Sequence, residues 1–103
     1  MYETAVVFRK WKDISTVIAL FPELPSDYQG FYCDSYERLG GHGGTDYYGI
    51  IAASVPARPD EYSGLQRELE RIGYRLRIVQ RASSEMHARC REEARRCREV
   101  TVV

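Results

Sequence analysis

The sequence of 103 residues lacks a long apolar run, a disulfide pattern and a net charge of either sign. Its longest apolar segment, Val17 to Phe21, is far shorter than the ~20 residues that a membrane helix needs. The opening Met1-Tyr2-Glu3 lacks the basic start and apolar block of a secretion signal. Three cysteines, Cys33, Cys90 and Cys97, are an odd number at uneven spacing, which does not fit a disulfide framework. We therefore expect a cytoplasmic protein with no membrane partner.

A complete catalytic or metal-binding motif is also missing. Cys33 and His42 form the one pair that could support thiol chemistry. Either Asp34 or Asp46 would then orient the imidazole. A cysteine within an apolar strand pattern is more often a small buried side chain, so we expect Cys33 to be buried and inert and His42 to be exposed. Cys33, His42 and Asp46 lack the close paired spacing of a zinc site. We expect no enzyme, no metal and no cofactor, with a Cys33–His42 thiol enzyme as the alternative.

The charges are unevenly distributed, although they cancel over the whole chain. Residues 1–74 hold 7 Lys and Arg against 11 Asp and Glu, a net charge of −4, whereas residues 75–103 hold 8 Arg against 4 Glu, a net charge of +4. Arginine suits planar contacts to carboxylate or phosphate groups. The interspersed glutamates and a sequence pI of about 6.7 argue against a general nucleic-acid binder.

Four segments have the β-branched and aromatic composition of strands, at residues 4–11, 16–21, 31–38 and 74–81. Pro22 is expected to end the second strand. Residues 47–55 fit either a strand or a short helix, and we favour a strand because Gly49 and Pro56 would shorten a helix. In the last strand, alternation turns one set of side chains towards solvent, namely Arg75, Arg77, Val79 and Arg81.

Residues 59–72 carry the clearest helical pattern. Pro59 suits the first helical position, and the acidic residues that follow it favour the positive end of the helix dipole. One apolar stripe faces the sheet, formed by Tyr62, Leu65, Leu69 and Ile72. Gly73 is expected to end the helix with a left-handed cap. The pattern predicts an α+β fold, in which a small antiparallel sheet of 4–5 strands carries this amphipathic helix on one face.

A basic helical tail is expected at residues 82–103, after an α+β domain at residues 1–81. Ser83 or Ser84 can cap the helix, which then continues to Arg98. Its narrow apolar seam consists of Met86, Cys90, Ala94 and Cys97. The seam could dock on the acidic body of the same chain or on the same helix of a second copy, and we favour a homodimer.

Aromatic and basic side chains are the candidates for a binding surface. Tyrosine is enriched at recognition surfaces, although tyrosines also pave sheets beneath helices. The candidate residues are Tyr32, Tyr36, His42, Tyr47, Tyr48, Arg75, Arg77 and Arg81. The glycine-rich segment 40–44 around His42 is interpreted as a connection that needs positive φ angles, with phosphate binding through its backbone as the alternative.

Several segments together resemble a family of short proteins from bacterial genomes, phages and other mobile elements, to which no activity has been assigned. The resemblance covers residues 4–81 and depends on Arg9-Lys10-Trp11, Ala19-Leu20-Phe21-Pro22-Glu23, Tyr32-Cys33-Asp34-Ser35-Tyr36, His42-Gly43 and the segment from Glu61-Tyr62 to Ile72-Gly73-Tyr74. It departs from the family at Arg58, where a threonine usually precedes the proline that opens the helix. The resemblance implies a fold and a genomic setting.

We therefore expect a small non-enzymatic binding module from a phage or another mobile element. It would dock on a protein partner, as an inhibitor, through its aromatic and arginine side chains. The alternative is a nucleic-acid or nucleotide binder that uses the glycine-rich segment and the arginine face.

Overall fold

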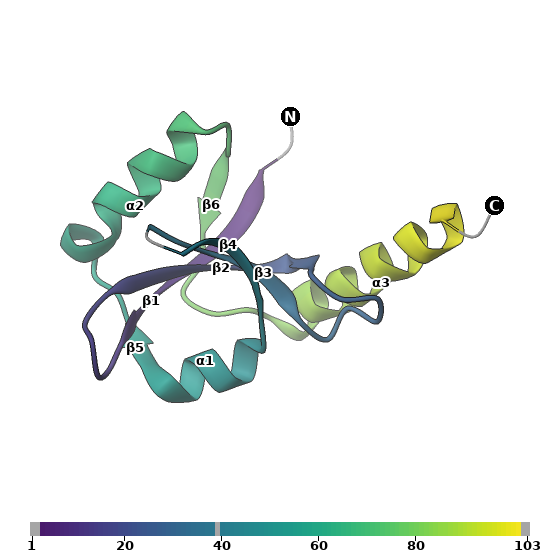
Figure 1. The fold of residues 1–103 in the computed structure, drawn as a ribbon, viewed down its shortest axis with the longest axis horizontal. Helices are drawn as coiled ribbons and strands as arrows, with labels where there is room; N and C mark the ends of the chain where they lie inside the picture. The colour runs from purple at the N-terminus through teal and green to yellow at the C-terminus, as the bar shows by residue number, and fades with distance from the viewer. Residues whose placement is uncertain (1–2, 39, 102–103) are drawn as a thin grey trace.

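The computed structural model describes residues 3–38 and 40–101, and it has the expected α+β fold (Figure 1). Four antiparallel strands follow one another across the sheet: β1 (Thr4–Trp11), β2 (Val17–Pro25), β3 (Cys33–Glu37) and β4 (Gly41–Thr45). The free edge of β1 is shared by two short strands. β5 (Ser54–Pro56) pairs antiparallel with the second half of β1, and β6 (Leu76–Ile78) pairs parallel with the first half.

In the described part of the chain, three helices cover the two faces of this sheet: α1 (Tyr47–Ala53), α2 (Pro59–Arg71) and α3 (Ser84–Thr101). α2 lies on one face, whereas α1 and the first half of α3 lie on the other, and the second half of α3 projects beyond the sheet (Figure 1). Strands β1 and β2 are therefore buried on both sides, as the continuous apolar run of β2 predicts.

The α2 face contains the larger of two apolar clusters, built on Val6, Phe8, Ala19, Phe21, Leu65 and Leu69. Tyr62 stacks on Phe8 with ring centroids 4.4 Å apart, and Tyr74 stacks on Phe21 at 5.0 Å. The predicted burial of Leu65 and Leu69 is confirmed. The prediction for Ile72 is wrong: α2 ends before it, and its side chain is 52% exposed. Gly73 has the expected left-handed conformation, with φ of 117°.

The second face contains Val7, Ile18, Leu20, Cys33, Tyr47 and Cys90. Here α3 begins at its expected cap, because the Ser83 hydroxyl oxygen accepts a hydrogen bond from the Met86 N–H at 3.2 Å. The seam of α3 faces the sheet, where Cys90 and Ala94 are buried, Met86 is half-buried and Cys97 is exposed. The centre of this seam is therefore buried against the sheet of the same chain. A homodimer through α3 stays a prediction, and Cys97 is the seam residue that remains accessible for it.

The strand favoured at residues 47–55 is wrong, because this segment forms α1 and only then the short strand β5. The Arg9 guanidinium explains the difference. It is buried and donates to the carbonyl oxygens of Ile51 (3.1 Å) and Ser54 (2.9 Å) at the carboxyl end of α1. A cation at this end of a helix satisfies open carbonyls and opposes the helix dipole.

Two strand boundaries also differ from the sequence prediction. β2 does not end at Pro22 but continues to Pro25, because its pairing with β3 shifts register between Phe21 and Pro25, so the prolines are accommodated at an irregularity. The glycine-rich segment forms β4 rather than a bare connection, although Gly41 does have the positive φ of 69° that a turn requires.

The last strand is shorter than the predicted 74–81 segment, and its arginine side does not simply face solvent. Arg75 and Arg81 are exposed. Val79 packs into the second cluster, and Arg77 lies 3.8 Å from the Glu23 carboxylate. The side of the sheet expected to be open is covered because α3 folds back onto it.

Candidate functional site

The aromatic residues proposed for binding separate into buried and exposed members. Tyr47 belongs to the core of the α1–α3 face, and its hydroxyl oxygen accepts a hydrogen bond from the Ala82 N–H at 2.7 Å. Tyr48 is exposed beside His87, with ring centroids 5.1 Å apart. Tyr32 is exposed, whereas Tyr36 is half-buried. Of these tyrosines, Tyr47 therefore stabilises the fold, whereas Tyr32 and Tyr48 are accessible to a partner.

Among the described residues, the largest group of exposed aromatic side chains lies in residues 26–32, the connection between β2 and β3, which we call the aromatic loop. Tyr28 is 73% exposed, Phe31 is 64% exposed and Tyr32 is 52% exposed. Exposed apolar side chains scattered one by one are ordinary, whereas here three exposed aromatic residues lie within five positions of one loop.

Hydrogen bonds within the aromatic loop hold its backbone in one shape. One carboxylate oxygen of Asp27 accepts from the N–H groups of both Gly30 and Tyr32, each at 3.0 Å. The Ser26 N–H donates to the Tyr32 carbonyl oxygen at 3.0 Å and closes the base of the loop. An aspartate that bonds the backbone ahead of it is the standard way to stabilise a turn.

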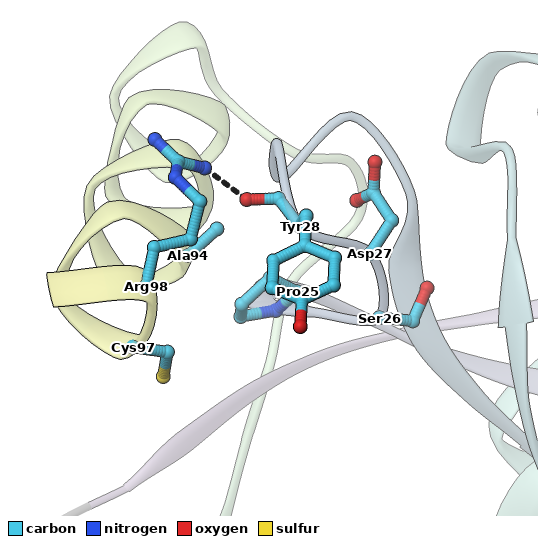
Figure 2. A pocket seen from close by; sticks show the side chains of 7 residues that line it. All are labelled: Pro25, Ser26, Asp27, Tyr28, Ala94, Cys97 and Arg98. Atoms are coloured by element: carbon cyan, nitrogen blue, oxygen red, sulfur yellow. Dashed lines mark hydrogen bonds between the residues drawn. The ribbon is translucent and has the colours of Figure 1, made fainter. Parts of the chain in front are cut away.

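Helix α3 supports the same loop from one side. Gly30 is buried with φ of 78°, and a Cβ atom at this position would lie 2.6 Å from the Arg91 Cα, so the two backbones are in direct contact. The Arg98 guanidinium donates to the Tyr28 carbonyl oxygen (Figure 2). Between loop and helix lies a hollow of about 310 Å³, lined by Pro25, Ser26, Asp27, Tyr28, Ala94, Cys97 and Arg98.

Most arginines of the basic tail are neutralised by carboxylates. Arg89 and Arg77 both pair with Glu23, which crosslinks α3 and β6 to β2. On the projecting half of α3, Arg95 pairs with Glu92 and Glu99, and Arg96 pairs with Glu93. Arg91, beside the aromatic loop, makes none of the ion pairs found among the described residues. No carboxylate in this part of the chain therefore neutralises its charge, which also lowers the pKa of His87.

A second polar cluster lies on the α2 face at the β3–β4 edge of the sheet. The Tyr36 hydroxyl donates to the Glu68 carboxylate at 2.5 Å, and the His42 Nε2 shares a hydrogen bond of 2.8 Å with the Tyr74 hydroxyl. Burial raises the pKa of Tyr74, and the bond to Glu68 raises the pKa of Tyr36. Both phenols are therefore held protonated, and neither is activated as a base.

The expected burial of Cys33 and exposure of His42 are confirmed. Cys33 packs in the α1–α3 cluster, whereas His42 contacts the rings of Tyr36 and Tyr74 on the α2 face. The sheet thus lies between the two side chains. Burial, followed by the neighbouring Cys90, raises the pKa of Cys33 to about 12, so its thiol is not poised as a nucleophile.

Sequence reasoning did not assign Asp27, Gly30 or Arg91 to the aromatic loop: it placed Asp27 in a turn region and Arg91 in a general arginine face, whereas here they fix and support the loop. The spacing of Asp27 and Gly30 is a turn signal that could have been recognised, since aspartate favours the first and glycine the fourth turn position. Nothing local connects Arg91 to a loop 60 residues earlier.

No family model, curated protein or solved structure matches this chain. Within residues 3–38 and 40–101, no group of three or more His, Cys, Asp or Glu side chains could hold a metal ion. In the same part of the chain, no helix has the length and apolar character needed to cross a bilayer.

Proposed function

We propose that this chain is a non-enzymatic protein-binding module that docks through the aromatic loop and the adjoining side of α3. The observation that carries this proposal is the contrast between the backbone and the side chains of the loop. The backbone is fixed by the Asp27 carboxylate and by the contact of Gly30 with α3, whereas Tyr28, Phe31 and Tyr32 project into solvent.

Such a loop favours binding for a thermodynamic reason. Ordering a flexible segment opposes association, and here the fold has already ordered it. Tyrosine and phenylalanine offer large contact areas with few rotatable bonds, so they lose little entropy when a partner covers them. In the free protein these aromatic rings contribute little to the free energy of unfolding, because more than half of each residue is exposed to water.

The positive charge on the adjoining part of α3 indicates the chemistry of the partner. Arg91 has no carboxylate partner among the described residues, and Arg98 lines the adjacent hollow. The complementary surface is an apolar depression on a protein, bordered by carboxylates. A module of this kind acts by occupying its target, so we propose an inhibitory role.

Nucleic acid is the less favoured partner. Binding to a phosphate backbone needs a stripe of uncompensated positive charge. In this structure Arg77, Arg89, Arg95 and Arg96 face carboxylates, which leaves no continuous stripe along α3 among the described residues.

Affinity capture from a bacterial lysate with and without nuclease treatment, followed by calorimetry with the purified captured protein, tests this proposal. Phe31→Ala and Tyr32→Ala should each weaken binding roughly 10-fold or more, as expected for aromatic residues at the centre of an interface. Arg91→Glu should weaken binding most at low salt. Ile14→Ala is the matched control, because Ile14 is 62% exposed in the β1–β2 connection. Unchanged affinity of both aromatic variants would overturn the proposal, as would binding that depends on nucleic acid.

A further inference from the structure

Helix α3 supports the backbone of the aromatic loop through two successive residues, Cys90 and Arg91. The Cys90 thiol donates a hydrogen bond to the Tyr32 carbonyl oxygen at 3.9 Å. The Arg91 backbone is in direct contact with Gly30, which is buried and has a positive φ of 78°. Both contacts reach the residues whose N–H groups donate to the Asp27 carboxylate. The shape of the loop therefore depends on the position of α3.

The beginning of α3 is held to the rest of the chain by few side chains. From its first residue to Cys90, only Cys90 is buried, and His87 is one of two half-buried residues. The His87 ring lies between α3 and α1, with its centroid 5.0 Å from that of Tyr47 and 5.1 Å from that of Tyr48. Segments with few buried contacts open locally at a lower free energy than the core does. The contact of His87 with α1 is therefore important for the position of α3.

The His87 Nε2 atom is buried and has no hydrogen-bond partner among the described residues. A neutral imidazole can leave this nitrogen unprotonated, so that only an acceptor lacks its bond. Protonation turns both ring nitrogens into donors and adds a positive charge, and burying an unpaired charge costs far more free energy than burying a neutral atom. The imidazolium recovers its hydrogen bonds when the ring reaches water, and this requires the beginning of α3 to move away from α1.

The groups on α3 and α1 that face His87 do not compensate a positive charge. Arg91, one turn further along α3, is itself a cation, and burial together with this charge lowers the pKa of His87 below its usual 6.5. From α1 the ring faces the phenols of Tyr47 and Tyr48, and burial raises the pKa of Tyr47, which stays neutral. Aromatic rings attract a cation only weakly compared with the water that a buried imidazolium loses.

Groups on the sheet and before α1 complete the surroundings of this ring. The Arg9 guanidinium acts on Tyr47 from the sheet and is already bound to carbonyl oxygens at the end of α1. Burial raises the pKa of Cys33 to about 12, so its thiol stays neutral, and the Asp46 carboxylate before α1 acts on this thiol. Among the described residues, none of these groups accepts a hydrogen bond from the His87 Nε2 atom.

We propose that His87 makes the aromatic loop sensitive to pH: its protonation detaches the first half of α3 from α1 and thereby removes the support of Gly30 and Tyr32. A helix turn moves as a unit, so a displacement at His87 also displaces Cys90 and Arg91. The support is complete when His87 is neutral. It weakens as the pH falls below about 6.5, where the open form binds the additional proton. This inference goes beyond the proposed function, because it concerns the free chain.

Hydrogen exchange of the Gly30 and Tyr32 amides in the full chain measures the support of the loop. Protection is expressed relative to an unstructured peptide at the same pH. Between about pH 8 and about pH 5.5, the protection of both amides should fall at least about 3-fold. In His87→Phe it should stay constant, because phenyl keeps the ring contacts and does not titrate. His42→Gln is the matched control: it removes the other histidine, which is exposed on the α2 face, and should behave as the original chain.

The same measurement in about 1 M urea distinguishes local opening from unfolding of the whole chain. Opening of the first half of α3 exposes little surface, so exchange at Gly30 should change little. The Leu69 amide on α2 should exchange faster, because Leu69 is fully buried and its exposure requires unfolding.

Four results would overturn the proposal: constant protection in the original chain, an equal fall in His87→Phe, a fall abolished by His42→Gln, or acceleration by urea at Gly30 as large as at Leu69. Its consequence for a partner rests on the proposed function, since affinity for the captured protein should then decrease at acid pH less in His87→Phe than in the original chain. The two failures are distinguishable, because the exchange measurements need no partner, whereas the proposed function fails if Phe31→Ala and Tyr32→Ala leave the affinity unchanged.

Discussion

His87 shows how a single side chain can work against the fold that surrounds it. Its ring lies 5.0 Å from that of Tyr47 and 5.1 Å from that of Tyr48, between α1 and α3. Its Nε2 atom is buried and has no hydrogen-bond partner among the described residues. Burial, together with the charge of Arg91, lowers the pKa of His87 below its usual 6.5. Protonation therefore favours the unfolded chain.

We expect His87→Phe to raise the free energy of unfolding by about 1 kcal/mol, because phenyl keeps the ring contacts and removes the unsatisfied nitrogen. The original chain should lose stability as the pH falls below about 6.5, where the unfolded chain binds the additional proton, and the variant should lose less. Urea unfolding at about pH 8 and about pH 5 measures both effects. Equal pH dependence of the two proteins would contradict this account.

The three thiols should differ in reactivity as they differ in burial. Cys33 and Cys90 are buried, with pKa values raised to about 12 and about 11, whereas Cys97 is exposed. With iodoacetamide near pH 8, we expect only Cys97 to be modified rapidly in the native protein, and all three after unfolding. Mass spectrometry of proteolytic fragments identifies the sites. Rapid modification of native Cys33 would instead support thiol chemistry.

Helix α2 depends on its buried stripe for stability. Its first turn is held by the Glu61 carboxylate, which accepts from the Arg58 N–H at 2.9 Å and pairs with Lys10 on β1. These contacts orient the helix, whereas the free energy that stabilises it in the folded protein comes mainly from the apolar side chains that face the sheet.

We expect Leu69→Ala to lower the free energy of unfolding by roughly 2–5 kcal/mol, the range for a fully buried leucine. Ile72→Ala in the adjacent cap should change it by less than about 0.5 kcal/mol, because the Ile72 side chain is half in solvent. Urea unfolding of both variants compares a core and a surface position on one element. Similar losses would show that α2 packs differently.

The molecule as a whole combines a sheet with a helix that is partly structural and partly projecting. The first half of α3 covers the α1–α3 face, where Cys90 and Ala94 are buried. The second half carries its own ion pairs and extends beyond the sheet (Figure 1). The sequence divided the chain into a domain at residues 1–81 and a tail at residues 82–103, whereas in the structure Cys90 of the tail belongs to an apolar cluster of the domain.

Deleting residues 83–103 should lower the free energy of unfolding by about 2 kcal/mol or more, because it exposes the apolar face around Leu20 and removes the support of Gly30. Deleting only residues 99–103 should have little effect, since it leaves Cys90, Ala94 and Arg98 in place. Urea unfolding followed by circular dichroism compares the two truncations. If the longer deletion unfolds at the same urea concentration as the full chain, residues 1–81 are an autonomous domain.

The sequence predicted a binding surface but not which residues form it. The many tyrosines and the basic tail indicated a binding surface. In the structure, however, some tyrosines pack in the core and others lie at the surface. Tyr47 is buried and Tyr32 is exposed, and the sequence pattern around each gives no means of separating them. The site was decided by the position of α3, which brings Arg91 to Gly30.

The sequence by itself determined the elements whose signals are local. β1 begins and ends as predicted, α2 begins at Pro59 and is capped by Gly73, and α3 begins after Ser83. Alternation, helical periodicity and capping depend on residues a few positions apart, so they can be read along the chain. Only the tertiary structure decided that residues 47–53 are helical and that the seam of α3 turns inward. These outcomes depend on contacts between residues far apart in the sequence, such as Arg9 with Ser54 and Gly30 with Arg91. A local sequence pattern cannot indicate such contacts.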